Sequence, residues 1–419
     1  MSEAPSLTRT TSRAAALAVL VAALGYFVDI YDLILFAMVR GPSLAALGVA
    51  EAERTSEGIY LFNMQMGGML VGGILWGMIG DKRGRLSVLF GSITLYSLAN
   101  LVNGHCDSLG MYAACRLVAG IGLAGELGAG ITLVSELMSA ERRGVGTTIV
   151  AGVGVFGGVV AGLIGGALPS VWGGVDWRTA YYIGGGLGLA LLALRVGLAE
   201  SGMFRTAAKA EHARGNFFAL FTSRKRLGRY LAIIAVGIPV WFVIGILFTF
   251  SKEIGGVLGL SPVPSPATTL FFGYGGAGFG GLGAGFLSVR LRSRKKTLAI
   301  FLLAVAVVST VYFVAGGASL TTFYAIAFAG GMATGYWAVF VSTSAELFGT
   351  NLRATVTTTV PNFVRGSLVP IALGFKLIAA SSNYVSAAIA VGVFCLALGA
   401  IGLVALPETY GADLDYLEE

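Results

Sequence analysis

The chain has 419 residues, of which 56% are hydrophobic and only 12% are charged, and its formal net charge is +7. A soluble domain carries about a quarter charged residues, so this composition excludes a soluble globular protein and indicates a membrane protein. The three cysteines and two histidines are too scattered to predict a metal site or a disulfide framework.

Long apolar runs recur along the whole chain, and each has about the 20 residues that a membrane-spanning helix needs. They predict an all-α membrane protein with twelve transmembrane helices. The first run is too long for the apolar core of a signal peptide, so it is expected to be the first span. The predicted spans are 14–38, 57–80, 87–104, 109–136, 146–168, 179–198, 230–250, 266–288, 297–316, 321–346, 356–378 and 384–405.

The only long hydrophilic stretch, residues 199–229, divides these helices into two groups of six. The predicted domains are therefore an N-terminal half (1–198) and a C-terminal half (230–419), joined by a cytoplasmic loop. Aromatic residues beside basic ones in this loop predict that it lies on the membrane surface. The sequence SEL at 135–137 is matched by AEL at 345–347, one at the end of each half's fourth span, which indicates internal duplication.

Lys and Arg gather in alternate loops of this topology, from the N-terminal tail through the middle loop to residues 290–296. The loops on the other side hold only Arg40, Arg54, Arg178 and Lys252. Because basic residues mark cytoplasmic loops, both termini are expected on the cytoplasmic side of a bacterial-type inner membrane. The basic excess then reflects topology, and no nucleic-acid partner is expected. The expected environment is the lipid bilayer, with the chain as a monomer.

Two patterns resemble signature motifs of the major facilitator superfamily. The first is GMIGDKRGR at residues 77–85, after the second span, with a degraded copy at 285–296 after the eighth. The second is RLVAGIG at residues 116–122, in the fourth span. The resemblance covers nearly all of the chain. It implies the major facilitator fold of two six-helix halves, a transporter rather than an enzyme, and no cofactor.

In this superfamily the signature loop is expected to help hold the cytoplasmic side closed. An acidic side chain at a helix end can pair with a nearby Arg or with the N-terminus of another helix. Glu136 and Glu346 lie at matching helix ends and are followed by basic residues. The residues expected to form this cytoplasmic clasp are Gly77, Asp81, Gly84, Arg85, Glu136, Arg142, Arg143, Glu346 and Arg353.

Four shorter patterns resemble particular branches of the superfamily. Asp29-x-x-Asp32 resembles the aromatic-acid–proton symporters, and Gly-Glu at 125–126 resembles the metabolite–proton symporters. Glu-Ser at 200–201 and Pro-Glu-Thr at 407–409 resemble closing motifs of the sugar-porter and metabolite-symporter branches. These branches differ in cargo, so the motifs leave both an organic acid and a sugar open.

Ionisable groups inside the predicted spans are costly to bury and indicate functional sites. At about 1.5 Å per residue, Asp32 and Arg116 lie at one depth, where an ion pair would offset the desolvation of both. Asp29 lies one turn deeper on the same helix face, and Glu126 lies near the middle of the fourth span. Neither has an evident cationic partner within the spans. Asp29, Asp32 and Glu126 are therefore the predicted proton-coupling residues.

Arg365 stands near the middle of the eleventh span, where its planar guanidinium suits a carboxylate cargo. The alternative is that Arg365 pairs with one of the carboxyls named above. Lys376, near the outer end of the same span, is expected to reach toward the membrane surface. Mid-depth aromatic residues either stack against a flat cargo or only pack. The candidate substrate-binding residues are Arg365, Arg116, Asn362, Trp241, Tyr336, Trp337, Gln65 and Tyr26.

The sequence therefore predicts a proton-coupled symporter of a small organic anion, such as a mono- or aromatic carboxylate, that works by alternating access. The alternatives are a proton-coupled sugar or polyol carrier and a drug or metabolite exporter. A membrane enzyme is disfavoured because no nucleophile–base pair or metal cluster lies within the spans. A sensor is disfavoured because the longest hydrophilic segment is too short for an output domain.

Overall fold

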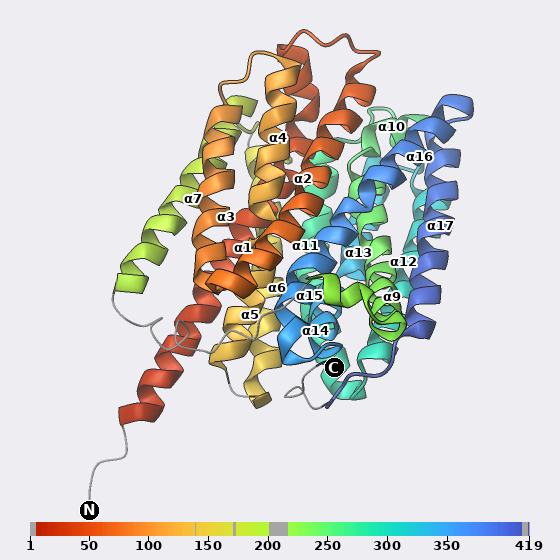
Figure 1. Ribbon diagram of the computed structural model, residues 1–419. Coiled ribbons are helices and arrows are strands. Elements are labelled where there is room, and N and C mark those ends of the chain that lie inside the picture. Colours follow the sequence, from red (N-terminus) through yellow and green to blue (C-terminus); the bar gives the residue numbers. More distant parts are fainter. Residues whose placement is uncertain (1–5, 139, 171–172, 201–216, 413–417, 419) are drawn as a thin grey trace, which may run out of the picture.

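The computed structural model describes residues 6–138, 140–170, 173–200, 217–412 and 418, and these residues are almost entirely helical. The helices pack as one elongated bundle, with the N-terminal elements on one side and the C-terminal elements on the other (Figure 1). The elements are α1 (Ser6–Ala46), α2 (Arg54–Arg83), α3 (Arg85–Asn103), α4 (Leu109–Leu123), α5 (Glu126–Leu137), α6 (Ala140–Ile164), α7 (Trp177–Glu200), η1 (Phe217–Phe221), α9 (Arg224–Phe242), η2 (Val243–Phe248), α10 (Ser251–Val257), α11 (Pro266–Leu291), α12 (Arg294–Ala315), α13 (Leu320–Thr334), α14 (Trp337–Glu346), α15 (Thr350–Gly366), α16 (Leu368–Ser381) and α17 (Tyr384–Ala405).

Within the described residues, eleven helical stretches are long and apolar enough to cross a membrane. A shorter apolar stretch, Ile149–Ile164 in α6, falls within the predicted fifth span. Together they account for the twelve predicted spans, so the predicted all-α fold is confirmed. The first span is longer than predicted and continues to Ala46, with Pro42 inside the helix. We call the end of the bundle where α1 begins and α17 ends the terminal face, and the other end the opposite face (Figure 1).

The predicted middle loop is shorter than expected. The helix α7 runs to Glu200 and α9 already begins at Arg224, while the residues between them that the structure describes include the 3-10 turn η1. In η1, Phe217 and Leu220 are buried, and the Phe217 ring lies 6.2 Å from the ring of Phe363 in α15. Part of the loop therefore packs against the helical bundle.

Three predicted spans are interrupted near their middles. The fourth span divides into α4 and α5 at residues 124–125, the tenth into α13 and α14 at 335–336, and the eleventh into α15 and α16 at Ser367. The seventh span changes from α-helix to π-helix at η2, four residues after Pro239. Irregular backbone at membrane depth occurs where it is buried in protein or lines a cavity. The interruptions therefore point to the centre of the bundle as the site.

The two halves share a close helix crossing. In the N-terminal half, α2 and α4 touch so closely that a Cβ on Gly120 would overlap the carbonyl oxygen of Gln65. In the C-terminal half, α11 and α13 make the corresponding contact, where a Cβ on Gly331 would overlap the carbonyl oxygen of Gly273. Small residues allow such close backbone approach between membrane helices. The halves in turn meet mainly through α2 with α15 and α6 with α11.

Candidate transport site

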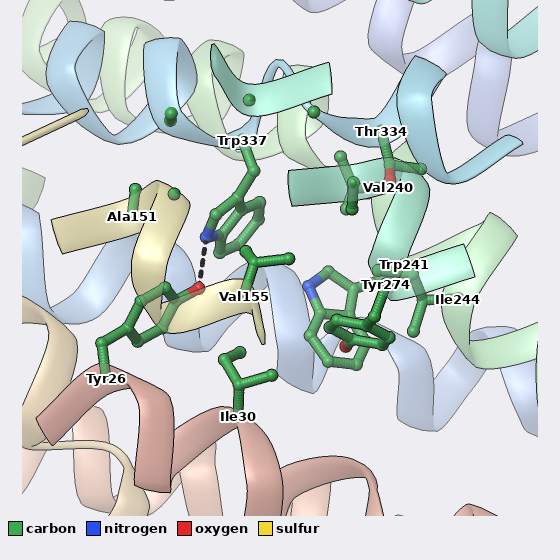
Figure 2. A pocket seen from close by; sticks show the side chains of 15 residues that line it. Tyr26, Ile30, Ala151, Val155, Val240, Trp241, Ile244, Tyr274, Thr334 and Trp337 are labelled. Atoms are coloured by element: carbon green, nitrogen blue, oxygen red, sulfur yellow. Dashed lines mark hydrogen bonds between the residues drawn. The ribbon is translucent and has the colours of Figure 1, made fainter. Parts of the chain in front are cut away.

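A cavity lies between the two halves. Its wall combines α1 and α6 of the N-terminal half with α9, η2, α11 and the α13–α14 break of the C-terminal half. Figure 2 shows the aromatic side chains that surround it. The lining residues are Tyr26, Ile30, Ala151, Gly152, Val155, Val240, Trp241, Ile244, Tyr274, Ala277, Gly281, Thr334, Gly335, Trp337 and Ala338.

The aromatic wall carries few polar groups. The indole Nε1 of Trp337 donates a hydrogen bond to the Tyr26 hydroxyl across the halves, over 2.9 Å (Figure 2). The Nε1 of Trp241 and the hydroxyl of Tyr274 are buried and have no hydrogen-bond partner among the described residues. A buried donor without a partner is costly. These two groups are therefore available to a bound solute.

Arg365 lies beside this wall. Its guanidinium carbon is 5.9 Å from the ring centres of both Trp241 and Trp337, and its side chain is 1% exposed. Its Nη2 lies 3.4 Å from Oδ2 of Asp29 in the other half, while Oδ1 of Asp29 has no partner within the described residues. Asp29 thus has a cationic partner within the spans, as in the alternative in which Arg365 pairs with a buried carboxyl. The contact is long and single, which leaves hydrogen-bonding capacity on both groups.

The predicted ion pair between Asp32 and Arg116 is not formed as a direct contact. Arg116 donates from Nη2 to Oε1 of Gln65, and its guanidinium carbon lies 5.4 Å from the ring centre of Phe36. Neither carboxyl oxygen of Asp32 has a hydrogen-bond partner in the part of the chain that the structure describes. The reason is the tight α2–α4 crossing, which presents Gln65 to the guanidinium.

Glu126 does have a cationic partner, contrary to the sequence-based expectation. Nη1 and Nη2 of Arg195 in α7 lie 2.9 and 2.8 Å from the two carboxylate oxygens of Glu126, and the Ser92 hydroxyl donates to Oε1 over 3.0 Å. A Cβ on Gly25 of α1 would overlap Arg195, so glycine makes room for the pair. A single Arg in the apolar run 183–198 was the available signal for this residue.

Other predicted substrate residues lie outside the cavity lining. The Nδ2 of Asn362 donates to the carbonyl oxygens of Ala124 and Thr358, both over 2.7 Å. The Tyr336 hydroxyl donates to the carbonyl oxygen of Val236 over 2.8 Å, so it fastens the α13–α14 break to α9. Asn362 therefore links the α4–α5 break to α15 of the other half.

The terminal face carries part of the predicted clasp. Glu346 binds Arg294 through two hydrogen bonds of 3.1 and 2.8 Å, and the Thr409 hydroxyl donates to Glu346 over 2.8 Å. Arg353 donates from Nε to the carbonyl oxygen of Ala345.

The glycines of the signature loop have structural roles. Gly84 ends α2 with φ at 85°, a conformation that favours glycine. Gly77 lies against α15, since a Cβ there would be 3.6 Å from Thr359. The side chains of Asp81, Arg85, Glu136, Arg142 and Arg143 lie outside the described part of the structure.

Glu408, the acidic residue of the closing Pro-Glu-Thr pattern, caps a helix. Its carboxylate accepts from the Ser293 hydroxyl and from the backbone N–H groups of Arg294 and Lys295, so it caps the N-terminus of α12. Partial burial alone would raise the pKa of Glu408. The hydrogen bonds from Ser293 and from the backbone N–H groups of Tyr410, Arg294 and Thr409 outweigh this effect and hold the pKa below its usual value.

The opposite face has its own contacts between the halves. Arg40 at the end of α1 lies 2.5 Å from the carboxylate of Glu253 in α10, with side chains 7% and 12% exposed. A Cβ on Gly58 would come within 2.5 Å of Cδ of Arg40, so glycine makes room for it. The Nζ of Lys376 donates to the Ser56 hydroxyl over 2.5 Å. Lys376, expected to reach toward the membrane surface, is exposed and links α16 to α2 at this face.

The fold and site define a membrane transporter: two helical halves enclose a cavity, and ion pairs join the halves beside it and at the opposite face. The chain belongs to the major facilitator superfamily, because the model of that family matches residues 15–367. This confirms the predicted family and confirms a transporter rather than an enzyme.

Two curated relatives illustrate the similarity. The 3-(3-hydroxy-phenyl)propionate transporter of Escherichia coli is 29% identical over 77% of this chain and 79% of that protein. The probable 4-methylmuconolactone transporter of Cupriavidus pinatubonensis is 25% identical over 94% of this chain and 91% of that protein. Among solved structures, the proton:xylose symporter XylE bound to 6-bromo-6-deoxy-D-glucose has a TM-score of 0.71. It covers 96% of this chain and 98% of its own at 15% identity, which shows the shared fold alone.

Proposed function

We propose that the chain is a proton-coupled symporter that imports a small organic anion, a mono- or aromatic carboxylate, by alternating access. The observation that carries this proposal is the place of Arg365. It lies between the aromatic wall of the cavity and a single carboxylate, Asp29, in the opposite half. A flat ring suits the space beside Trp241 and Trp337. The names of the two relatives, one carrying an aromatic propionate and the other a muconolactone, agree with this class of cargo.

Coupling follows from competition for Arg365. A cargo carboxylate that binds the guanidinium bidentately displaces Asp29, whose present contact is a single one of 3.4 Å. Two carboxylates beside one guanidinium leave an uncompensated buried charge, which is costly. A proton taken up by Asp29 removes that charge. Anion and proton then enter together.

Asp32 is the second proposed proton site. Burying a charged carboxylate with neither oxygen hydrogen-bonded is unfavourable, so proton binding there offsets the cost of burial. Glu126 differs, because Arg195 binds both of its oxygens. Glu126 can accept a proton only when that pair opens, which we assign to the step in which α5 moves against α7.

The proposed orientation in the inner membrane places the terminal face in the cytoplasm. Its support is the density of Lys and Arg in loops on that side. Outward opening then breaks the contacts of Arg40 with Glu253 and of Lys376 with Ser56. Inward opening separates α2 and α5 from α15 and breaks the bond from Asn362 to Ala124.

The test is transport into proteoliposomes with an imposed pH gradient. The probes are benzoate and nicotinate, with their neutral amides as matched controls and xylose as the probe for a sugar carrier. Gradient-driven uptake of a carboxylate, with its amide excluded, is the expected result. Uptake of xylose without any carboxylate would refute the organic-anion proposal in favour of the sugar carrier. Extrusion driven by an inward proton gradient would favour an exporter.

A further inference from the structure

Two of the three cysteines meet at the opposite face. Cys106 lies in the turn between α3 and α4, and Cys115 lies in the second turn of α4. Their Sγ atoms are 3.7 Å apart, and both side chains are buried. Their positions in the sequence do not indicate that they meet. They meet because the turn after α3 folds back over the first turns of α4, where the Ser108 hydroxyl accepts a hydrogen bond from Met111 N.

We propose that Cys106 and Cys115 form a disulfide bond. This proposal uses the orientation proposed above, in which the turn faces the periplasm, a compartment where disulfides form and persist. A disulfide has a sulfur–sulfur distance of about 2.05 Å, so the proposal requires the two sulfurs, now 3.7 Å apart, to approach by rotation about the Cα–Cβ bonds. His105, Asp107 and Ser108 beside Cys106 are exposed, so the turn is open to an oxidant.

The reaction is thiol–disulfide exchange with an oxidant that itself carries a disulfide, either a periplasmic protein or oxidised glutathione. One cysteine loses its proton, attacks the oxidant and forms a mixed disulfide. The thiolate of the second cysteine then displaces the remaining half of the oxidant. In total the two thiols lose two protons and two electrons, and the oxidant leaves as two thiols.

The disulfide would add to hydrogen bonds that already hold the turn between α3 and α4. Arg178 donates from Nη2 to the carbonyl oxygen of Cys106 over 3.0 Å, and the Tyr182 hydroxyl donates to that of Gly104 over 2.9 Å. Both donors come from α7. The next residue after Cys115 is Arg116, which binds Gln65. The disulfide therefore fixes the start of the helix that carries Arg116.

The experiment counts free thiols in the full chain. Protein is extracted from membranes without reductant, denatured, alkylated with a maleimide and weighed by mass spectrometry. One adduct, on Cys395, is expected before reduction and three after it. Cys115→Ser should give two adducts under both conditions, and Cys395→Ser should give none before reduction and two after it. The oxidised protein should also melt at a higher temperature than the reduced one, a difference that Cys115→Ser should abolish.

Three adducts in non-reduced protein, unchanged after incubation with oxidised glutathione, would overturn the proposal. A disulfide that includes Cys395, or one that joins two chains, would overturn it as well. The result is independent of the transport test: a thiol count of one supports the disulfide even if no carboxylate is transported.

Discussion

The buried pair between Glu126 and Arg195 predicts a distinct pattern of single and double substitutions. The two side chains are 1% and 3% exposed and share two hydrogen bonds. Removing one partner leaves the other charge buried and unpaired, at a cost of about 3–5 kcal/mol. Glu126→Gln and Arg195→Met should each lose stability of this order. The double variant removes both charges, so it should recover most of the loss.

The assay is the thermal unfolding midpoint of each variant in detergent without ligand. The fraction of protein that stays unaggregated after heating is a second measure. Ser92→Ala is the matched control, because it removes only the neutral donor to Glu126 and should cost about 1 kcal/mol. Single variants as stable as the wild type, or a double variant that loses the sum of both single effects, would refute the reasoning. The same variants test coupling: Glu126→Gln should weaken gradient-driven uptake more than counterflow exchange.

The remaining predictions concern three further sites. Arg365→Ala should weaken binding of an anionic probe by about 1.5–3 kcal/mol and abolish discrimination between a carboxylate and its amide. Arg365→Lys should rescue binding only in part. Equal binding of the carboxylate and the amide by the wild type would contradict this. Glu253→Gln should weaken the contact with Arg40 by removing the carboxylate charge. The cavity should then become more accessible from the opposite face to a thiol reagent, measured at a cysteine placed at Ile30; unchanged labelling would show that the contact does not hold this face closed. Because its pKa is lowered, Glu408 should make the wild type more stable than Glu408→Gln above the ordinary pKa of 4.5. This difference in stability should disappear as the pH falls through the lowered pKa. Unfolding midpoints of both proteins between pH 7 and pH 3 test this, and a difference in midpoint that does not change with pH would contradict it.

The helical fold was predictable because the chain consists of long apolar runs. Each span must satisfy its own backbone hydrogen bonds in lipid, so a long apolar run can only be a helix. The partners of the buried charges were less predictable. Which residues meet depends on the rotation of each helix about its axis and on the distance between helices. Gly25 and Gly120 set those distances because they lack side chains. Gly120 belongs to the RLVAGIG motif, but nothing in the sequence shows which residue either glycine faces.

The candidate site shows the same limit. Counting the rise per residue put Trp241, Trp337 and Arg365 all at mid-depth, but it did not predict that the guanidinium lies 5.9 Å from both rings. Depth also placed Asp32 level with Arg116, but it could not show that Gln65 takes the guanidinium. Tyr274 was missed because a single tyrosine in a glycine-rich span has no pattern that distinguishes a lining residue from a packing one.

The hydrogen bond from Asn362 to the Ala124 carbonyl has a consequence for hydration. The donor belongs to one half and the acceptor to the other, at a point where α4 has already ended. When the halves separate on this side, both groups lose a protein partner at the same moment. A carbonyl at this depth can then be satisfied only by water that follows the opening inward. Separation of the halves and hydration of the interrupted helix should therefore occur together. Dehydrating conditions such as high osmolyte concentration should then shift the transporter toward the form that is closed on this side.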